Sequence, residues 1–243
     1  MIHIDLKGEG TPRVLSIFSF RFDEHLVPDL RANTAPLVDG WLSWNDTSGQ
    51  GAFTDELSRR WALLNAARDA GAQWVMLLDP DERIEKRVRR NYHSLLDSGS
   101  NLVTFRLREM YSASSYRVDG VWDEKRQGRL LNVQEALVRP AVAPGTLHVP
   151  WKSYLAAPRV LDTDFNVYHL KQIDPQRRRG RSRLYSQLDP DRRMQSIGYD
   201  YLSDETGMRL RSVTWRHRYT PRHVDDGGLW MAPEVADDAG PTP

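Results

Sequence analysis

The chain has 243 residues, of which 40% are hydrophobic and 28% charged, as in ordinary soluble globular proteins. A net charge of only +1 argues against a general nucleic-acid binder, and the absence of cysteine excludes disulfides, thiolate metal sites and a cysteine nucleophile. No apolar run reaches the roughly 20 residues that span a bilayer, and the start lacks the layout of a signal peptide. We therefore expect a cytoplasmic protein without a membrane span (in the host cytoplasm if a phage encodes it).

The first half of the chain predicts strands and helices in alternation. Apolar runs of strand length, bounded by turn residues, predict strands at residues 14–20, 38–44 and 74–78. Amphipathic spacing between them predicts helices at residues 23–37 and 54–70. Because β-α-β-α-β order with short connections is typical of parallel strands covered by helices, we expect an α/β fold with a Rossmann-type, mostly parallel sheet.

Polar residues follow each of these three strands. The first strand ends at Phe20 and Arg21, the second is followed by Asp46, and the third by the sequence Asp-Pro-Asp-Glu at residues 79–82. In such a sheet, ligands bind outside the carboxyl ends of the strands. These residues should therefore face one crevice.

The second half of the chain is less regular. A helix is expected at about residues 83–97 and a strand at 101–108, before an irregular, substrate-facing stretch at 109–136. Further short strands are expected at residues 130–138, 147–151, 160–161 and 166–170. A basic helix is expected at residues 176–185.

These patterns predict three parts of the chain. A catalytic domain is expected at residues 1–172, an Arg-rich C-terminal extension packed on it at 173–235, and a disordered tail at 236–243. The extension contains a dense basic run, with five Arg between residues 177 and 183. This run either clamps a diphosphate, grips an anionic acceptor such as a DNA backbone or a teichoic-type polymer, or forms a solvated helix face.

The acidic run after the third strand carries the strongest chemical signal. Asp79 and Asp81 leave an apolar strand two residues apart, so both can point toward one place in the crevice. Mn²⁺ and Mg²⁺ prefer carboxylate oxygens and complete their coordination with diphosphate and water. We expect Asp81 to be the better metal ligand, Asp79 to touch ribose or a metal-bound water, and Glu82 to orient either one. The alternative is an acidic turn that caps a helix starting near Arg83.

Three segments together resemble a known enzyme family. Residues 38–48, then Arg60 and Asn65, then residues 74–82 look like the first half of a family 2 glycosyltransferase with the GT-A fold. The resemblance covers about residues 13–108, and it indicates a protein of phage or actinobacterial type. Residues 145–148 are similar to the family's later histidine element.

The resemblance implies roles for individual residues. Five residues are expected to bind the nucleotide-sugar: Phe20, Arg21, Asp46, Arg60 and Asp79. Among them, Asp46 matches the acidic residue that contacts the base or ribose. The metal ligands are expected to be Asp79, Asp81 and His148, because neutral imidazole suits Mn²⁺-type sites, and His169 competes with His148 for this role. The alternative for each histidine is a purely structural role.

The catalytic base is harder to identify. The family uses an Asp or Glu in a loop after the acidic motif, and Asp119, Asp123 and Glu124 lie in that part of the chain. We expect Asp123 or Glu124 to act, because the neighbouring Trp122 offers a surface on which a sugar or base can stack, and Glu82 is a further acidic candidate. The alternative is a solvated acidic loop.

The leading hypothesis is a metal-dependent glycosyltransferase with Mn²⁺ or Mg²⁺. It would move a sugar from a UDP- or GDP-sugar to a hydroxyl acceptor of unknown class (a glycan, a protein, or a component of a cell surface or virion), with inversion as the resemblance implies. Two alternatives stay open. One is glycosylation of a hydroxylated DNA base, with a nucleic acid as partner. The other is a catalytically degenerate GT-A domain that binds nucleotide-sugar without turnover.

Overall fold

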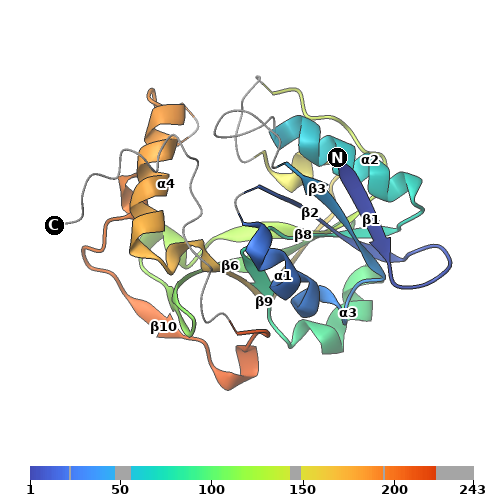
Figure 1. The fold of residues 1–243 in the computed structure, drawn as a ribbon, viewed down its shortest axis with the longest axis horizontal. Helices are drawn as coiled ribbons and strands as arrows, with labels where there is room; N and C mark the ends of the chain where they lie inside the picture. Colours follow the sequence, from blue (N-terminus) through green and yellow to red (C-terminus); the bar gives the residue numbers. More distant parts are fainter. Residues whose placement is uncertain (22, 47–55, 143–148, 194, 223–243) are drawn as a thin grey trace.

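A computed structural model describes all residues of the chain except 22, 47–55, 143–148, 194 and 223–243. Within these limits, ten strands form one sheet in the order β1-β3-β2-β4-β8-β6-β7-β10, with β9 beside β6 and β5 beside β9 (Figure 1). The strands are β1 (Ile2–Leu6), β2 (Val14–Phe20), β3 (Gly40–Asn45), β4 (Trp74–Leu77), β5 (Glu82–Ile84), β6 (Leu102–Ser112), β7 (Ser115–Arg117), β8 (Arg126–Asn132), β9 (Val160–His169) and β10 (Leu210–Ser212). The α-helices are α1 (Val27–Thr34), α2 (Glu56–Asp69), α3 (Val88–Leu96) and α4 (Pro175–Leu188).

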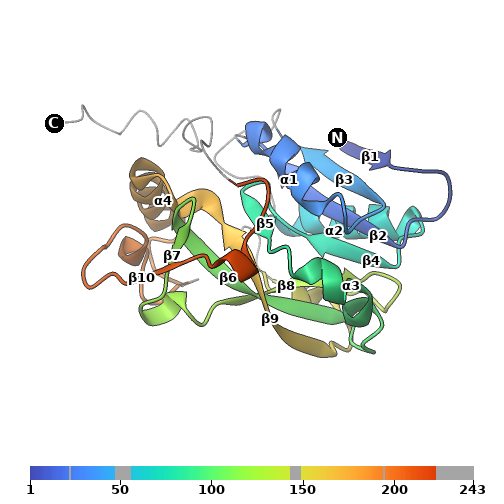
Figure 2. The same ribbon diagram turned by 90° about the horizontal axis from the view of Figure 1, so that it is seen from below.

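The parallel part of the sheet is built as the sequence predicts. Strand β2 lies between β3 and β4 and runs parallel to both. All four residues of β4 are buried: Trp74 and Met76 pack in the core with α1 and α3, whereas Val75 and Leu77 pack in the core with α2. Figure 2 shows α1 and α3 on one side of the sheet and α2 on the other. The α/β class, with a Rossmann-type sheet flanked by helices, is confirmed.

The second half of the sheet is mixed. Strand β8 pairs antiparallel with both β4 and β6, and β9 runs parallel to β6. The expectation of an irregular stretch at residues 109–136 is therefore wrong, because this stretch contains the end of β6, all of β7 and all of β8. The two short strands expected at 160–161 and 166–170 are one strand, β9.

Buried charges explain the error in β6. Arg108 and Glu109 interrupt its apolar pattern and suggest a solvated loop, yet both side chains are buried and paired with other polar groups. A pattern of hydrophobicity alone cannot recognise such pairs, because it counts every charge as exposed.

Two further boundaries differ from expectation. The helix expected at 83–97 starts later, at Val88, because residues 82–84 form β5 and pair with the end of β9. Trp151, expected at the end of a strand over residues 147–151, instead begins one turn of 3₁₀-helix that runs to Tyr154. Residues 147–148 lie outside the described residues.

The C-terminal extension begins with α4, which confirms the expected basic helix. Asp174 caps it by accepting hydrogen bonds from the backbone N–H of Gln176 (2.7 Å) and Arg177 (3.4 Å), and Pro175 fits the first helical position. Figure 1 shows α4 on the opposite side of the molecule from α2. In the described ranges, no helix is long and apolar enough to cross a membrane, and the predicted tail at 236–243 falls outside those ranges.

Candidate active site

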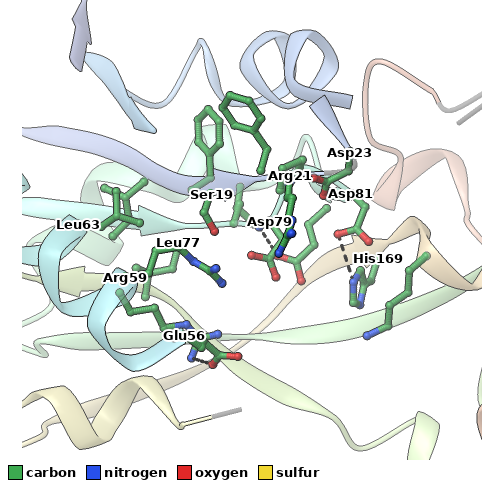
Figure 3. Close-up of a pocket in the computed structure, with 18 of the residues that line it drawn as sticks. Ser19, Arg21, Asp23, Glu56, Arg59, Leu63, Leu77, Asp79, Asp81 and His169 are labelled. Carbon is green, nitrogen blue, oxygen red and sulfur yellow. Dashed lines mark hydrogen bonds and ion pairs between the residues drawn. The ribbon is translucent and has the colours of Figure 1, made fainter. Parts of the chain in front are cut away.

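A cleft lies at the carboxyl ends of β2, β3 and β4. Its lining includes five of the predicted strand-end residues, which are Phe20, Arg21, Asp46, Asp79 and Asp81, and the neighbouring Ser19. Helix α2 forms one side, and the end of β9 together with α4 forms the other. In Figure 3, Asp79 and Asp81 lie close to Arg21 and Asp23, and Glu56 and Arg59 lie together farther along the cleft. The predicted convergence of the three strand ends is confirmed.

The acidic turn after β4 is held by Glu82. One Glu82 carboxylate oxygen accepts a hydrogen bond from the backbone N–H of Asp79 (2.9 Å), and the other pairs with Arg129 of β8 (2.5 Å). Arg129 also donates to the carbonyl of Leu77, the last residue of β4 (3.0 Å). Glu82 is 1% exposed, and burial raises its pKa although Arg129 opposes this shift. Its contacts favour a role in fixing the turn.

Arg83 clamps the same turn from the other side. Its guanidinium donates to the carbonyls of Pro80 (2.6 Å) and Glu82 (2.7 Å), and the side chain is completely buried. Asn33 of α1 adds a two-way pair with Ile84, accepting from its N–H (2.7 Å) and donating to its carbonyl (3.0 Å). The turn that carries Asp79 and Asp81 is therefore rigid before any ligand binds.

Asp81 belongs to a buried chain of charged groups. Its Oδ1 lies 3.3 Å from Nε2 of His169, and Nδ1 of His169 lies 3.1 Å from a carboxylate oxygen of Glu109. Burial alone would raise the pKa of Asp81, but His169, Arg177 and Arg181 hold it well below its usual range. Burial lowers the pKa of His169, yet the two carboxylates raise it by more. Asp81 is thus an ionised carboxylate at the cleft floor.

Cations face these carboxylates from the C-terminal side. Lys171 follows β9 and lines the cleft, with its Nζ 3.8 Å from Glu109. Burial lowers the pKa of Lys171 to about 8, and the nearby Arg181 acts in the same direction. On α4, Arg177 lies 3.8 Å from Asp81, and Arg181 lines the cleft.

The basic run is therefore not a solvated helix face. Arg177, Arg178 and Arg181 are buried, whereas Arg179 and Arg183 are exposed. The buried arginines contact protein groups rather than forming an open basic strip.

Asp23 is a cleft residue that sequence analysis missed. It lies three residues beyond β2, is 8% exposed, and accepts a hydrogen bond from the backbone N–H of Arg21 (3.2 Å). Burial and the charge of Asp81 raise its pKa to about 7. Its sequence signal was that of an acidic residue at the start of a helix, which is common on surfaces.

The α2 side of the cleft positions Asp46. Its carboxylate pairs with Arg59 at 3.1 Å and is largely buried. Arg60 also lines the cleft, where it pairs with Glu56 (2.8 Å) and stacks over the ring of Trp151 (4.5 Å). The arginines on this side are thus held by neighbouring carboxylates.

Two of the predicted bases, Asp123 and Glu124, do not line the cleft, whereas Glu82 does. The Asp123 carboxylate pairs with Arg108 at 2.6 Å, and Glu124 is exposed. Arg108 precedes Glu109 on β6, and successive strand residues point to opposite faces, so Arg108 turns away from His169. The next residue, Lys125, reaches the cleft floor, with its Nζ 3.5 Å from Glu109.

Metal binding was predicted for Asp79, Asp81 and His148. Asp79 and Asp81 come from the same turn, whereas His148 lies outside the described residues. Among the residues that are described, no group of three or more His, Asp and Glu side chains has the arrangement of a metal site. Asp81 and His169 do form a pair of possible ligands, with Oδ1 of Asp81 3.3 Å from Nε2 of His169.

Comparison with known proteins finds similar solved structures. No protein-family model and no curated protein matches the chain. Among solved structures, A197 from STIV is similar at 12% identity and a TM-score of 0.41, over 65% of this chain and 85% of that one. S. aureus TarS 1-349 is similar at 11% identity and a TM-score of 0.41, over 79% of this chain and 70% of that one. A glycosyltransferase involved in the glycosylation of the major capsid of PBCV-1 is similar at 13% identity and a TM-score of 0.36, over 63% of this chain and 83% of that one.

Proposed function

We propose that the protein is a glycosyltransferase that moves a sugar from a nucleoside-diphosphate donor to a hydroxyl acceptor. The observation that carries this proposal is the convergence of Asp46, Asp79 and Asp81 from two strand ends on one cleft. The order and spacing of these residues are those of the family 2 glycosyltransferases that the sequence resembles. The opposite side of the cleft supplies the cations that an anionic donor needs.

We also propose that Mn²⁺ or Mg²⁺ binds at Asp81 and His169, with Asp79 nearby. Nδ1 of His169 faces Glu109 and Nε2 faces Asp81, so an acceptor lies on each side of one imidazole ring. If Nδ1 carries the proton and donates to Glu109, Nε2 of His169 and the ionised Asp81 carboxylate would be the groups that hold the metal ion. A carboxylate that orients a ligand histidine is a frequent feature of metal sites. In this proposal His169 is a ligand whether or not His148 contributes.

Each side of the cleft then has a distinct task. Asp46, held by Arg59, is placed to accept hydrogen bonds from the ribose or base of the donor. A metal ion at Asp81 would stabilise the negative charge that grows on the leaving diphosphate. Glu82 and Arg83 act indirectly by holding the acidic turn. Preorganised charges of this kind need little rearrangement during the reaction.

The acceptor hydroxyl must lose its proton during transfer. Asp123 and Glu124 remain the proposed bases, and the contact between Lys125 and Glu109 brings their loop to the edge of the cleft floor. Such a base is expected to contribute about 10²- to 10⁴-fold to the rate. Inversion of the anomeric carbon is part of the proposal, because it follows from direct attack of the activated hydroxyl on the donor.

The test is turnover of UDP- and GDP-sugars with Mn²⁺ by the wild-type protein and by Asp81→Asn. Release of UDP or GDP should be detectable for at least one donor and should fall by at least about 100-fold in the variant, because Asp81 contacts the metal ion. Asp97→Asn is the control, since Asp97 is exposed and pairs with Arg13 on the surface. Equal nucleotide release by wild type and Asp81→Asn would contradict the proposal.

A further inference from the structure

The face of α4 that points toward the cleft carries three residues at one helical spacing. Arg177, Arg181 and Tyr185 are each four residues apart, which places them on one side of a helix. All three are buried, and Arg181 donates a hydrogen bond to the Tyr185 hydroxyl (3.1 Å). Arg181 and Tyr185 line the cleft, together with Lys171, which lies just before the helix. We call Lys171, Arg177 and Arg181 the α4 cationic face.

Cations at this face interact with two buried carboxylates. Arg177 and Arg181 interact with Asp81, and Lys171 and Lys125 share Glu109. His169 contacts both of these carboxylates as well. Because Lys171 and Arg181 also line the cleft, the side opposite α2 presents positively charged groups to a ligand.

The members of the face differ in what they can offer a ligand. Arg177 is completely buried and lies against Asp81, so it acts as a support for that carboxylate. Arg181 and Lys171 both line the cleft. On the α2 side of the cleft, Arg59 pairs with Asp46, and Arg60 pairs with Glu56 and donates to the carbonyl of Val149 (2.8 Å).

We propose that Arg181 and Lys171 bind the diphosphate of the donor, so that the nucleotide site is completed by the C-terminal extension. This inference rests on the proposed function, and it assigns α4 to the donor rather than to an anionic acceptor. The acidic turn and α4 then hold the diphosphate between them. Arg181 contributes charge and hydrogen bonds to the phosphate oxygens, and Lys171 contributes a point charge.

Binding of nucleoside diphosphates and monophosphates tests this assignment. The full-length protein is titrated with UDP, UMP, GDP and GMP in the presence of Mn²⁺, and affinities are measured by calorimetry for wild type, Arg181→Met and Arg181→Lys. Loss of a charge-assisted contact should weaken binding of the preferred diphosphate by about 10- to 100-fold in Arg181→Met. Its monophosphate should change by less than about threefold, and Arg181→Lys should restore part of the diphosphate affinity.

Arg179→Met is the matched control, because Arg179 lies on the exposed side of the same helix. It should leave all four affinities unchanged. Thermal unfolding of each variant reports whether the helix stays in place. If Arg181→Met unfolds, Arg181→Lys tests the assignment in its place. It keeps the positive charge but changes the geometry of the contact, so it should weaken binding of the diphosphate more than binding of the monophosphate.

The possible failures are distinguishable. If the wild-type protein binds none of the four nucleotides, the proposed function itself fails. If it binds diphosphates and Arg181→Met binds them equally well, only the assignment of α4 is overturned. An equal loss for diphosphate and monophosphate would also overturn it, because that result indicates a general structural role.

Discussion

The two sides of the cleft floor are built in different ways. The acidic side is a single turn after β4, where Arg83 donates a hydrogen bond to a backbone carbonyl and the Glu82 carboxylate accepts one from a backbone N–H. The basic side is a helix, α4, whose inner face packs through a small aromatic cluster that contains Trp122, Tyr185 and Tyr199. The acidic side is thus continuous with the main hydrophobic core, whereas the basic side has a small core of its own.

The charged side chains of the two sides are therefore positioned by different means. On the acidic side, Asp79 and Asp81 are neighbours in the sequence, and short-range hydrogen bonds determine their direction. On the basic side, Lys171 and Arg181 meet Asp81 only because β9 and α4 are folded against the first half of the chain. Damage to the first side should reduce stability most, and damage to the second should reduce ligand binding.

The largest effect is expected where the acidic side is anchored. Arg129→Met leaves Glu82 buried without its partner, and removal of one member of a buried pair costs about 3–5 kcal/mol. The free energy of unfolding, measured in urea, should fall by this amount. Glu82→Gln combined with Arg129→Met should recover part of the loss.

Arg126→Met is the control for that experiment, since Arg126 is on the same strand but exposed. Its unfolding free energy should stay within about 0.5 kcal/mol of wild type. A similar small loss in Arg129→Met would show that the buried pair does not hold the turn.

The same contacts show which features of the acidic side could be predicted from the sequence. The positions of Asp46, Asp79 and Asp81 at strand ends could be predicted, because strand order and the ends of parallel strands determine them. The partner of Glu82 could not be predicted, since Arg129 lies 47 residues away in a stretch that was expected to be irregular. A charged residue within an apolar, strand-length segment is the signal that would have revealed it.

The next largest effect is expected at the junction of the two sides. His169→Gln removes the ring between Asp81 and Glu109, and it should weaken Mn²⁺ binding by about 100-fold, because a proposed ligand is lost. Affinity is measured by titrating Mn²⁺ at a fixed nucleotide concentration. His93→Gln, on the exposed side of α3, should bind Mn²⁺ as wild type does.

Unchanged Mn²⁺ affinity in His169→Gln would place the metal ion elsewhere in the molecule. A loss of stability with normal Mn²⁺ affinity would indicate that His169 is structural.

A moderate effect is expected where α4 is attached. Arg178 donates to the carbonyl of Gln172 (2.5 Å), pairs with Glu205 and lies over the ring of Tyr111 (4.4 Å). Arg178→Met should lower the free energy of unfolding by about 2 kcal/mol, because a buried carbonyl loses its donor. Hydrogen exchange should increase in α4 and not in β4. Uniform exchange along the chain would contradict the separation of the two sides.

The smallest effect is expected on the outer surface of the same helix. Arg179→Met should change the free energy of unfolding by less than about 0.5 kcal/mol, because the side chain is exposed. Urea unfolding of Arg179→Met and Arg178→Met, measured under the same conditions, compares the two changes in the free energy of unfolding. Comparable losses in the two variants would mean that the inner and outer faces of α4 are not distinct.

The basic side also shows what sequence could not decide. The five Arg between 177 and 183 predict a helix and a positive charge, but their direction depends on where α4 docks. Helical spacing groups Arg177 with Arg181, yet it does not say which face is inward. His169 was recognised as a candidate ligand, whereas its second partner, Glu109, was missed because β6 was expected to end at residue 108.

The central claim is that the cleft binds a nucleotide-sugar through Asp81. The most direct test is a calorimetric titration of UDP-glucose and GDP-mannose with Mn²⁺ into wild type and Asp81→Asn. We expect at least one donor to bind wild type with one site per chain, and Asp81→Asn to bind it at least about tenfold more weakly, because a charged contact is lost. Equal affinity for wild type and variant, or no binding of either donor to wild type, would contradict the account.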